Sequence, residues 1–347
     1  MNLGQHSLAV FSLLTILACG ADGEAPLARF KFAQPHMGTI FRIVVYARNV
    51  RAASRASSAA FNRIAALDNT MSDYQSSSEL MALCRRAGGP PVPVSEDLFR
   101  VLEKSQELAG RTHGAFDITC GPVVRLWRRA RRRSELPDPQ ELAEARKLVG
   151  YTNVRLDNKR RTVQLLKSGM LLDLGGIAKG YAADQALAVL KKQGIASALV
   201  AAGGDIAVGA PPPGEEGWRI GIEPLESPAK PPNRFLMLRD QGVSTSGDSE
   251  QYVEIGGKRY SHIVDPRTGM ALTGRSSVTI IADDATTSDA TATAISVLGP
   301  DEGLAFAKSA HHIILFFVAA TERGDRSYEW GSLPFAVSES SEGAATK

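Results

Sequence analysis

The stretch from residue 171 to residue 181 constrains the fold more strongly than any other part of the chain. It reads LLDLGGIAKGY, which predicts a strand over 170–174, a turn at two glycines and the start of a helix. A helix start presents unpaired N–H groups and a positive dipole end, and Lys179 adds a positive charge. Such a turn would suit a diphosphate. Because it is neither a Walker nor a Rossmann motif, a purely structural turn is the alternative.

The spacing of apolar residues predicts helices and strands in an irregular order. Helices are predicted at 56–71, 95–108, 138–150, 178–193 and 288–298. Strands are predicted at 39–47, 162–167, 170–174, 198–201, 218–222, 235–239, 252–255, 259–264 and 277–282. Ser95 and Asp138 are expected to cap their helices, and Gly194 is expected to end one. Long runs of strands that do not alternate strictly with helices predict an α+β fold.

The overall charge argues against nucleic acid as the ligand. The chain has 347 residues, and its 40 Lys and Arg against 37 Asp and Glu leave a net charge of only +3. An arginine-rich run at 125–133 has no aromatic series beside it, so a solvated helix face or an acidic partner is favoured there. The 3 cysteines are too few for a disulfide scaffold and lack the spacing of a zinc site. A small-molecule site is the better hypothesis.

The N-terminus predicts export. Residues 7–18 form a mostly apolar stretch that suits a signal-peptide core, and ILAC at 16–19 resembles the lipobox of bacterial lipoproteins. We therefore expect a signal peptide at 1–18, a linker at 19–35, one domain at 36–336 and a flexible tail at 337–347. The protein would be periplasmic and lipid-anchored through Cys19, with a buried N-terminal helix as the alternative. Whether Cys84 pairs with Cys120 is open.

Asp289 and Thr293 are the strongest candidates for metal ligands. They lie four residues apart on a predicted helix, so both side-chain oxygens face the same side. A carboxylate, a hydroxyl and a main-chain carbonyl are hard oxygen ligands of the kind that Mg²⁺ accepts. The alternative is that Asp289 only caps the helix.

Three further polar motifs are candidates. His262 is predicted at the end of a strand, where an imidazole can reach a cleft as an acid or base, although a structural histidine is the alternative. GGD at 203–205 is either a ligand-binding turn or a simple turn with Asp205 as a cap. STSGD at 244–248 is predicted to be a polar turn that either binds a ligand or closes a hairpin.

Taken together, the order of these motifs resembles that of the ApbE family of FAD:protein FMN transferases. The resemblance covers residues from about 37 to 300 and includes MGT at 37–39, MSDY at 71–74, SEL at 78–80, AFDIT at 115–119, GP at 121–122, the 173–181 stretch, GGD, STSG, HIVDP at 262–266 and DATAT at 289–293. It implies a T-fold-related α+β protein with mixed sheets and helices around a deep FAD cleft. The implied reaction moves FMN from FAD to a threonine hydroxyl of another protein and releases AMP.

The resemblance also implies roles for individual residues. Mg²⁺ would be bound by Asp289, Thr293 and the carbonyl of Gly176, and His262 would assist proton removal from the acceptor hydroxyl, with Asp289 as the second catalytic residue. The FAD site would be lined by Met37, Tyr74, Ala115, Phe116, Asp117, Asp173, Lys179, Asp205 and Val264. Tyr74 is expected to stack on the isoalloxazine, with a core position as the alternative. The implied acceptor is an electron-transfer subunit carrying a Ser-Gly-Ala-Thr-like motif.

Two other functions remain open from the sequence. If water enters in place of a protein hydroxyl, the chain is an FAD pyrophosphatase that yields FMN and AMP. If the metal site does not work, it is a flavin-binding lipoprotein without turnover.

Overall fold

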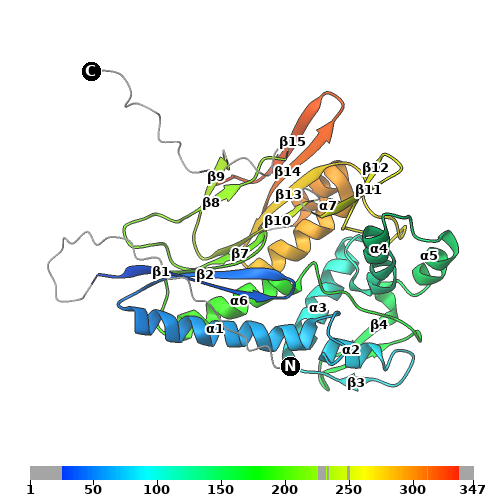
Figure 1. The fold of residues 1–347 in the computed structure, drawn as a ribbon, viewed down its shortest axis with the longest axis horizontal. Coiled ribbons are helices and arrows are strands. Elements are labelled where there is room, and N and C mark those ends of the chain that lie inside the picture. Colours follow the sequence, from blue (N-terminus) through cyan, green and yellow to red (C-terminus); the bar gives the residue numbers. More distant parts are fainter. Residues whose placement is uncertain (1–25, 226–231, 233, 248–250, 311, 336–347) are drawn as a thin grey trace, which may run out of the picture.

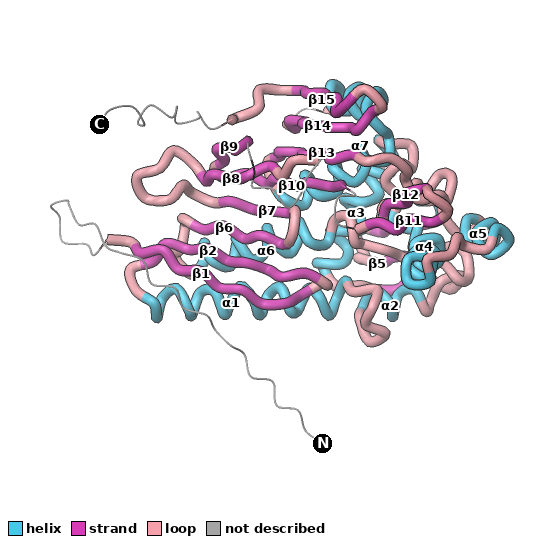
Figure 2. The backbone as a smooth tube through the Cα atoms, turned by 45° about the horizontal axis from the view of Figure 1, so that its top comes forward, coloured by secondary structure: helices cyan, strands magenta, loops and turns pink. Residues whose placement is uncertain are grey.

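An antiparallel sheet of eight strands forms the centre of the molecule (Figures 1 and 2). The computed structural model describes residues 26–225, 232, 234–247, 251–310 and 312–335. The strands lie in the order β1, β2, β6, β7, β10, β13, β14, β15. Their bounds are Ala28–His36, Thr39–Ala47, Ala198–Ala202, Asp205–Val208, Gln241–Gly247, Ser276–Ala282, Ile313–Thr321 and Gly324–Trp330. This sheet and its helices confirm the α+β class.

Strand β2 shows how the sequence sets the two faces of the sheet. Its residues alternate, and Phe41, Ile43 and Val45 are completely buried while the residues between them are more exposed. The buried set faces a layer of helices, α1 (Val50–Met71), α6 (Ala178–Lys192) and α7 (Ala285–Ser309) (Figure 2). Part of the other face is covered by the two-stranded sheet of β8 (Trp218–Ile222) and β9 (Arg234–Leu238).

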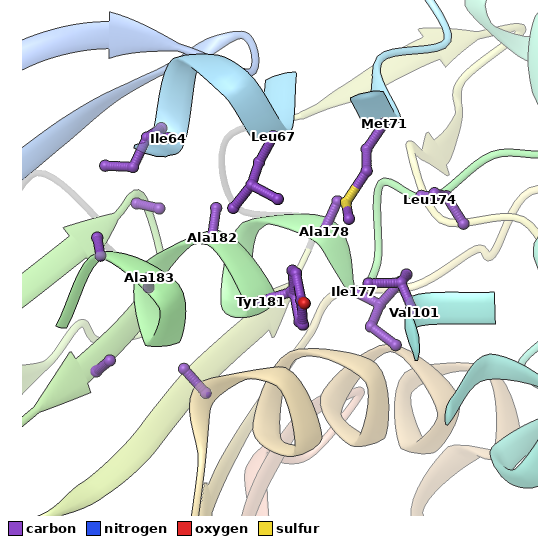
Figure 3. Packing of buried hydrophobic residues seen from close by; sticks show 14 of the residues in the cluster. Ile64, Leu67, Met71, Val101, Leu174, Ile177, Ala178, Tyr181, Ala182 and Ala183 are labelled. Atoms are coloured by element: carbon purple, nitrogen blue, oxygen red, sulfur yellow. The ribbon is translucent and has the colours of Figure 1, made fainter. Parts of the chain in front are cut away.

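The helix layer is held by apolar contacts between α1 and α6 (Figure 3). Ile64 and Leu67 of α1 are completely buried, and each such side chain stabilises the fold by roughly 1.5–3 kcal/mol. They pack over α6, whose small residues at 180, 182, 183 and 186 let it lie close to both neighbouring helices. Helix α7 is interrupted at Gly299, whose φ of 77° is not helical, immediately before Pro300.

The remaining elements gather at the end of the sheet where the β1–β2 and β6–β7 turns lie (Figure 2). They are α2 (Glu79–Cys84), α3 (Glu96–Arg111), α4 (Gly121–Arg133), α5 (Pro139–Arg146), two short 3₁₀ turns (Ile118–Cys120 and Tyr151–Asn153), a three-stranded sheet of β3 (Val92–Pro93), β5 (Thr162–Leu165) and β4 (Val154–Asp157), and a hairpin of β11 (Tyr252–Ile255) and β12 (Lys258–Ser261). None of the described helices has the length and apolarity that a bilayer-spanning segment needs.

Most predicted elements are confirmed, but three expectations need correction. Residues 170–174 form no strand, because their main-chain N–H groups donate to partners outside any sheet, as when Asp173 N donates to Ile118 O of a 3₁₀ turn at 2.8 Å. The predicted polar turn at 244–248 is wrong over its described residues, since β10 runs to Gly247 and pairs with β13. The predicted linker at 19–35 overlaps β1, which pairs with β2 from Ala28 onward. The predicted signal peptide and the tail from residue 337 lie outside the described residues.

Candidate active site

Helices α6 and α7 run antiparallel, and three contacts fix their register. Asp184 of α6 accepts hydrogen bonds from the main-chain N–H groups of Ala285 and Thr286 at 2.9 and 2.8 Å. One turn earlier, a Cβ on Gly180 would lie only 2.1 Å from the carbonyl oxygen of Ala285, so only glycine permits this approach. One turn earlier again, Gly176 lies against α7, where a Cβ would be 2.9 Å from Thr293 Oγ1. Residues far apart in sequence therefore lie together along the contact between α6 and α7.

The predicted acid on α7 lies at this contact between α6 and α7. Asp289 is 4% exposed, and its Oδ2 accepts a hydrogen bond from Gly180 N at 3.0 Å. The alternative in which Asp289 caps its own helix is wrong, because Asp284 caps α7 by accepting from Thr287 N at 2.7 Å. Asp289 instead satisfies an N–H group in the first turn of α6, where the helix dipole favours a negative charge.

Lys179 lies between two buried carboxylates. Its Nζ contacts Asp205 Oδ2 and lies 3.7 Å from Asp289 Oδ2. Burial raises the pKa of Asp289 well above its usual range, and the nearby Asp205 raises it further. Burial disfavours the charged form of Lys179, but the two carboxylates outweigh this and raise its pKa. With one cation for two buried acids, a further cation beside Asp289 would favour its ionised form.

The oxygen donors around Thr293 fit a small divalent cation. Thr293 Oγ1 has no hydrogen-bond partner among the residues that the structure describes, although the side chain is partly buried. It adjoins Gly176 and lies one helical turn from Asp289. Within the described part of the chain, no three His, Cys, Asp or Glu side chains form a metal-binding group. A cation here would have a mixed set of carboxylate, hydroxyl and carbonyl oxygens, with remaining positions left to water or phosphate.

Asp173 precedes the glycine turn and holds it. Its Oδ1 accepts a hydrogen bond from Gly175 N at 2.8 Å, and its Oδ2 accepts one from Arg128 Nη2 at 2.7 Å. Arg128 also pairs with Asp73, and its guanidinium lies 4.4 Å from the ring centroid of Tyr74. Burial and the neighbouring Asp173 raise the pKa of Asp73. Tyr74 is 76% exposed, so its alternative position in the core is wrong.

Two tight turns lie together beside this region. Met37 and Gly38 form the two-residue turn between β1 and β2, and both have positive φ, 48° and 73°. This conformation is unusual for methionine, and Met37 N donates to Asp68 Oδ2 at 3.0 Å. Gly203 forms the corresponding β6–β7 turn, where a Cβ would be 3.4 Å from Thr39 Oγ1. This supports the turn interpretation of GGD, but Asp205 pairs with Lys179 instead of capping a helix.

The predicted base lies just beyond β12. His262 Nδ1 is 3.2 Å from the carbonyl oxygen of Gln251. A carbonyl can only accept, so this bond requires the proton on Nδ1 and leaves Nε2 with a lone pair in the neutral ring. The neighbouring Ile263 packs with Ala115 and with Val297, which lies one turn beyond Thr293 on α7. The chain beside His262 therefore meets the same helix as the acid and hydroxyl.

The other predicted flavin contacts are mainly buried side chains. Phe116 is 4% exposed in the main core, and Val264 packs in a separate cluster with Trp127 of α4. Asp117 accepts from Thr119 N, Thr119 Oγ1 and Tyr151 N at 2.8, 2.7 and 2.7 Å, which commits its carboxylate to local structure. These side chains are therefore committed to the folded core and to local hydrogen bonds.

The structure brings together Gly176, Lys179, Asp205, Asp289 and Thr293 as one cluster, with Asp173 on the adjoining turn. Sequence reasoning missed Arg128 and Asp184. Arg128 is one member of a basic run that the sequence assigns to a solvated helix face or an acidic partner, and no local signal separates it from its neighbours. Cys84 and Cys120 are both free, and the Cys84 Sγ instead accepts a bond from Leu172 N at 3.4 Å.

These features define a class: an α+β protein whose glycine turn, lysine and oxygen donors suit a phosphate-containing ligand held with a cation. The family model described as "ApbE family" matches residues 37–317. A protein from Treponema pallidum named FAD:protein FMN transferase is 33% identical and is aligned over 90% of this chain and 91% of its own length. One of the same name from Vibrio cholerae is 30% identical, covering 94% of this chain and 98% of its own.

Solved structures agree with these relatives. The flavin transferase ApbE from Vibrio cholerae superimposes with a TM-score of 0.79 at 28% identity, over 88% of this chain and 97% of that one. An ApbE protein from Thermotoga maritima gives 0.77 at 32% identity, over 87% and 97%. The chain belongs to the ApbE family.

Proposed function

We propose that this protein transfers FMN from FAD to a hydroxyl group of another protein and releases AMP. The family and the names of the relatives support flavin transfer. The observation in this chain that carries the proposal is the convergence of α6 and α7, which places Lys179 beside Asp289 and Gly176 beside Thr293. This arrangement offers a positive charge and oxygen donors where a diphosphate could bind next to a cation.

The reaction exchanges a phosphoanhydride linkage of FAD for a phosphoester linkage to the acceptor. The acceptor oxygen forms a bond to the phosphorus on the FMN side of FAD, and the bond from that phosphorus to the bridging oxygen breaks. AMP carries the bridging oxygen away, and the acceptor hydroxyl loses its proton. Asp289, Thr293 and the Gly176 carbonyl would bind Mg²⁺, which when bound neutralises charge on the diphosphate. Lys179 would stabilise the charge that develops on the phosphate oxygens, and Asp205 holds its ammonium in place.

His262 is suited to take the acceptor proton. Its hydrogen bond to the Gln251 carbonyl orients the ring and places the proton on Nδ1, which leaves Nε2 able to accept. A free threonine hydroxyl is a poor nucleophile near neutral pH, so a positioned base increases its reactivity. Asp289 contributes by binding the cation and by fixing the start of α6 through Gly180.

The flavin half of FAD would lie toward the exposed ring of Tyr74. Main-chain atoms at Met37, at 115–117 and near Val264 would complete the site, with Asp173 holding the glycine turn. The acceptor would be a threonine in a Ser-Gly-Ala-Thr-like motif of an electron-transfer subunit. We further propose that the protein acts in the periplasm, anchored by a lipid on Cys19.

A single assay separates this proposal from the two alternatives. The protein is incubated with FAD, Mg²⁺ and a domain carrying the Ser-Gly-Ala-Thr motif, and the products are examined by mass spectrometry. We expect a covalent FMN adduct on the domain that requires Mg²⁺. FMN and AMP without an adduct would instead support the pyrophosphatase, and unchanged FAD would support a binding protein without turnover.

Asp289→Asn tests the site in the same assay. We expect adduct formation to fall by at least about a hundredfold, because a cation ligand and the cap of α6 are both weakened. The matched control is Asp301→Asn, which removes an exposed carboxylate in the last part of the same helical element. Equal activity of Asp289→Asn and Asp301→Asn would contradict the assignment.

A further inference from the structure

Arg128 is an arginine of α4 that joins two other segments of the candidate site. Its side chain is 16% exposed and contacts Asp73 and Asp173, whose side chains are 13% and 9% exposed. Asp73 follows α1, and Asp173 precedes the glycine turn of α6. A guanidinium can satisfy two carboxylates at once because its donors form a planar fork. Its charge offsets both acids, which raise the pKa of Arg128 despite burial.

The same guanidinium lies against Tyr74. The distance from its central carbon to the ring centroid is 4.4 Å, within the range of a cation–π contact. Because Tyr74 is 76% exposed, most of the rest of the ring is open to solvent. An aromatic ring fixed on one side and open elsewhere can present a flat surface to a planar ligand without a further loss of rotamer freedom.

A continuous series of contacts connects this ring to the phosphate end of the site. Arg128 Nη2 donates to Asp173 Oδ2 at 2.7 Å, and Asp173 Oδ1 accepts from Gly175 N at 2.8 Å. Gly176 follows directly and adjoins Thr293. Asp173 is also fixed through its own N–H, which donates to Ile118 O at 2.8 Å. A displacement of Arg128 would therefore change the positions of both Tyr74 and the glycine turn.

We propose that Arg128 is a positioning residue that fixes the Tyr74 ring and the 175–176 turn relative to each other, so that the flavin ring and the phosphate of one ligand bind simultaneously. This inference rests on the proposed function, because it assigns the two ends of FMN to these two places. A merely structural ion pair would stabilise the fold without linking the two ends. The two roles can be told apart by affinity. If the two subsites are held in register, a ligand that fills both binds more tightly than a ligand that fills only one.

The test compares ligands that contain one end or both. Riboflavin, FMN and FAD are titrated into the protein in EDTA, and binding is followed by quenching of flavin fluorescence, so no turnover is needed. In the unaltered protein, FMN should bind more tightly than riboflavin. In Arg128→Met, combined with Asp73→Asn to remove one of the two acids that lose their partner, this advantage should fall about tenfold. Arg128→Lys should restore part of it, because the charge remains but the planar fork is lost.

The matched control is Arg132→Met, which removes an exposed arginine one turn later on α4 and should leave the FMN advantage unchanged. An unchanged advantage in the Arg128 variant would overturn the inference. Equal weakening of all three ligands, together with a lower Tm, would also overturn it, since that is the result of a purely structural role.

A second measurement covers the case in which Arg128→Met does not fold. Arg128→Lys, Tyr74→Leu and the double variant form a cycle for FMN affinity, and the combined loss should be smaller than the product of the single losses. If the loss of FMN affinity in the double variant equals the product of the two single losses, the inference is overturned. Transfer of FMN by the unaltered protein is measured separately. If transfer occurs and the cycle shows no coupling, only the inference fails; if flavin binds with coupling but no transfer occurs, only the proposed function fails.

Discussion

Thr293 is the residue whose role is easiest to isolate. Its hydroxyl has no protein partner among the described residues, so removing it costs no internal hydrogen bond. Asp289, by contrast, is bonded to Gly180 N, and its replacement disturbs the start of α6. A defect at Thr293 therefore reports on the ligand site more directly than a defect at Asp289.

We expect Thr293→Val to lower the rate of FMN transfer by about tenfold to a hundredfold at fixed Mg²⁺, because valine keeps the shape and lacks the oxygen donor. The rate should recover partly at higher Mg²⁺, and Thr293→Ser should retain most of the activity. The measurement is the transfer rate as a function of Mg²⁺ concentration, with Tm as a check on folding. A Thr293→Val protein with an unchanged Mg²⁺ requirement would remove Thr293 from the cation site.

At the scale of elements, the contact between α6 and α7 decides whether the site exists. The closest approach is at Gly180, where a Cβ would lie 2.1 Å from Ala285 O and 2.8 Å from Asp289 Cβ. Neither the carbonyl oxygen of Ala285 nor the Cβ atom of Asp289 can move without shifting helix α7. Glycine is unfavourable within a helix, so its presence here is explained by this approach and not by local propensity.

Gly180→Ala should therefore destabilise the protein by about 1–3 kcal/mol or more and reduce FMN transfer, since α7 must move away from α6. Gly110 provides the matched control. It lies exposed in α3, and a Cβ added there would meet no other atom within 4 Å, so Gly110→Ala should be neutral or stabilise by up to about 1 kcal/mol. Chemical denaturation gives both values. Similar effects of the two substitutions would show that the close approach is unimportant.

Elements with local signals were predictable from sequence, and elements without them were not. Ser95 and Asp138 cap α3 and α5 as expected, accepting from Leu98 N and from Gln140 N and Glu141 N, because caps depend on neighbouring residues. The segment 170–174 has a strand-like composition, but its N–H groups donate to distant partners, Ile118 O and Cys84 Sγ, which no sequence pattern reveals. Strand β14 (Ile313–Thr321) was not predicted, although its first residues are apolar and largely buried.

At the scale of the whole molecule, the candidate site also contains residues that local motifs reveal and residues that only the folded structure brings in. Asp289, Thr293 and Lys179 were predictable because their spacing and the glycine turn belong to short motifs. Their neighbours Arg128 and Asp184 act through residues 45 and 101 positions away, as in Arg128 with Asp173 and Asp184 with Ala285. Such pairings depend on how α4 packs beside the glycine turn and α6 beside α7 in the folded molecule. Sequence spacing alone does not contain that information.

Asp184 also links the site to the pH dependence of global stability. Burial raises the pKa of Asp184 from 3.8 to about 6, although bonds from Thr286 and Ala285 oppose the shift. The folded protein therefore binds a proton more readily than the unfolded chain does. The stability from this group is fully present below about pH 4 and is lost as the pH rises through about 6.

We therefore expect the free energy of unfolding of the unaltered protein, minus that of Asp184→Asn, to fall between about pH 4 and pH 6 by on the order of 3 kcal/mol. The subtraction removes groups common to both proteins, including Asp289. Urea denaturation at several pH values in EDTA provides the two curves. Because asparagine does not titrate, a difference that stays flat over this range would mean that Asp184 ionises at its ordinary pKa, and a difference that rises would mean a pKa below it. The hydrogen bonds from Ala285 and Thr286 would then compensate the whole cost of burying the Asp184 carboxylate.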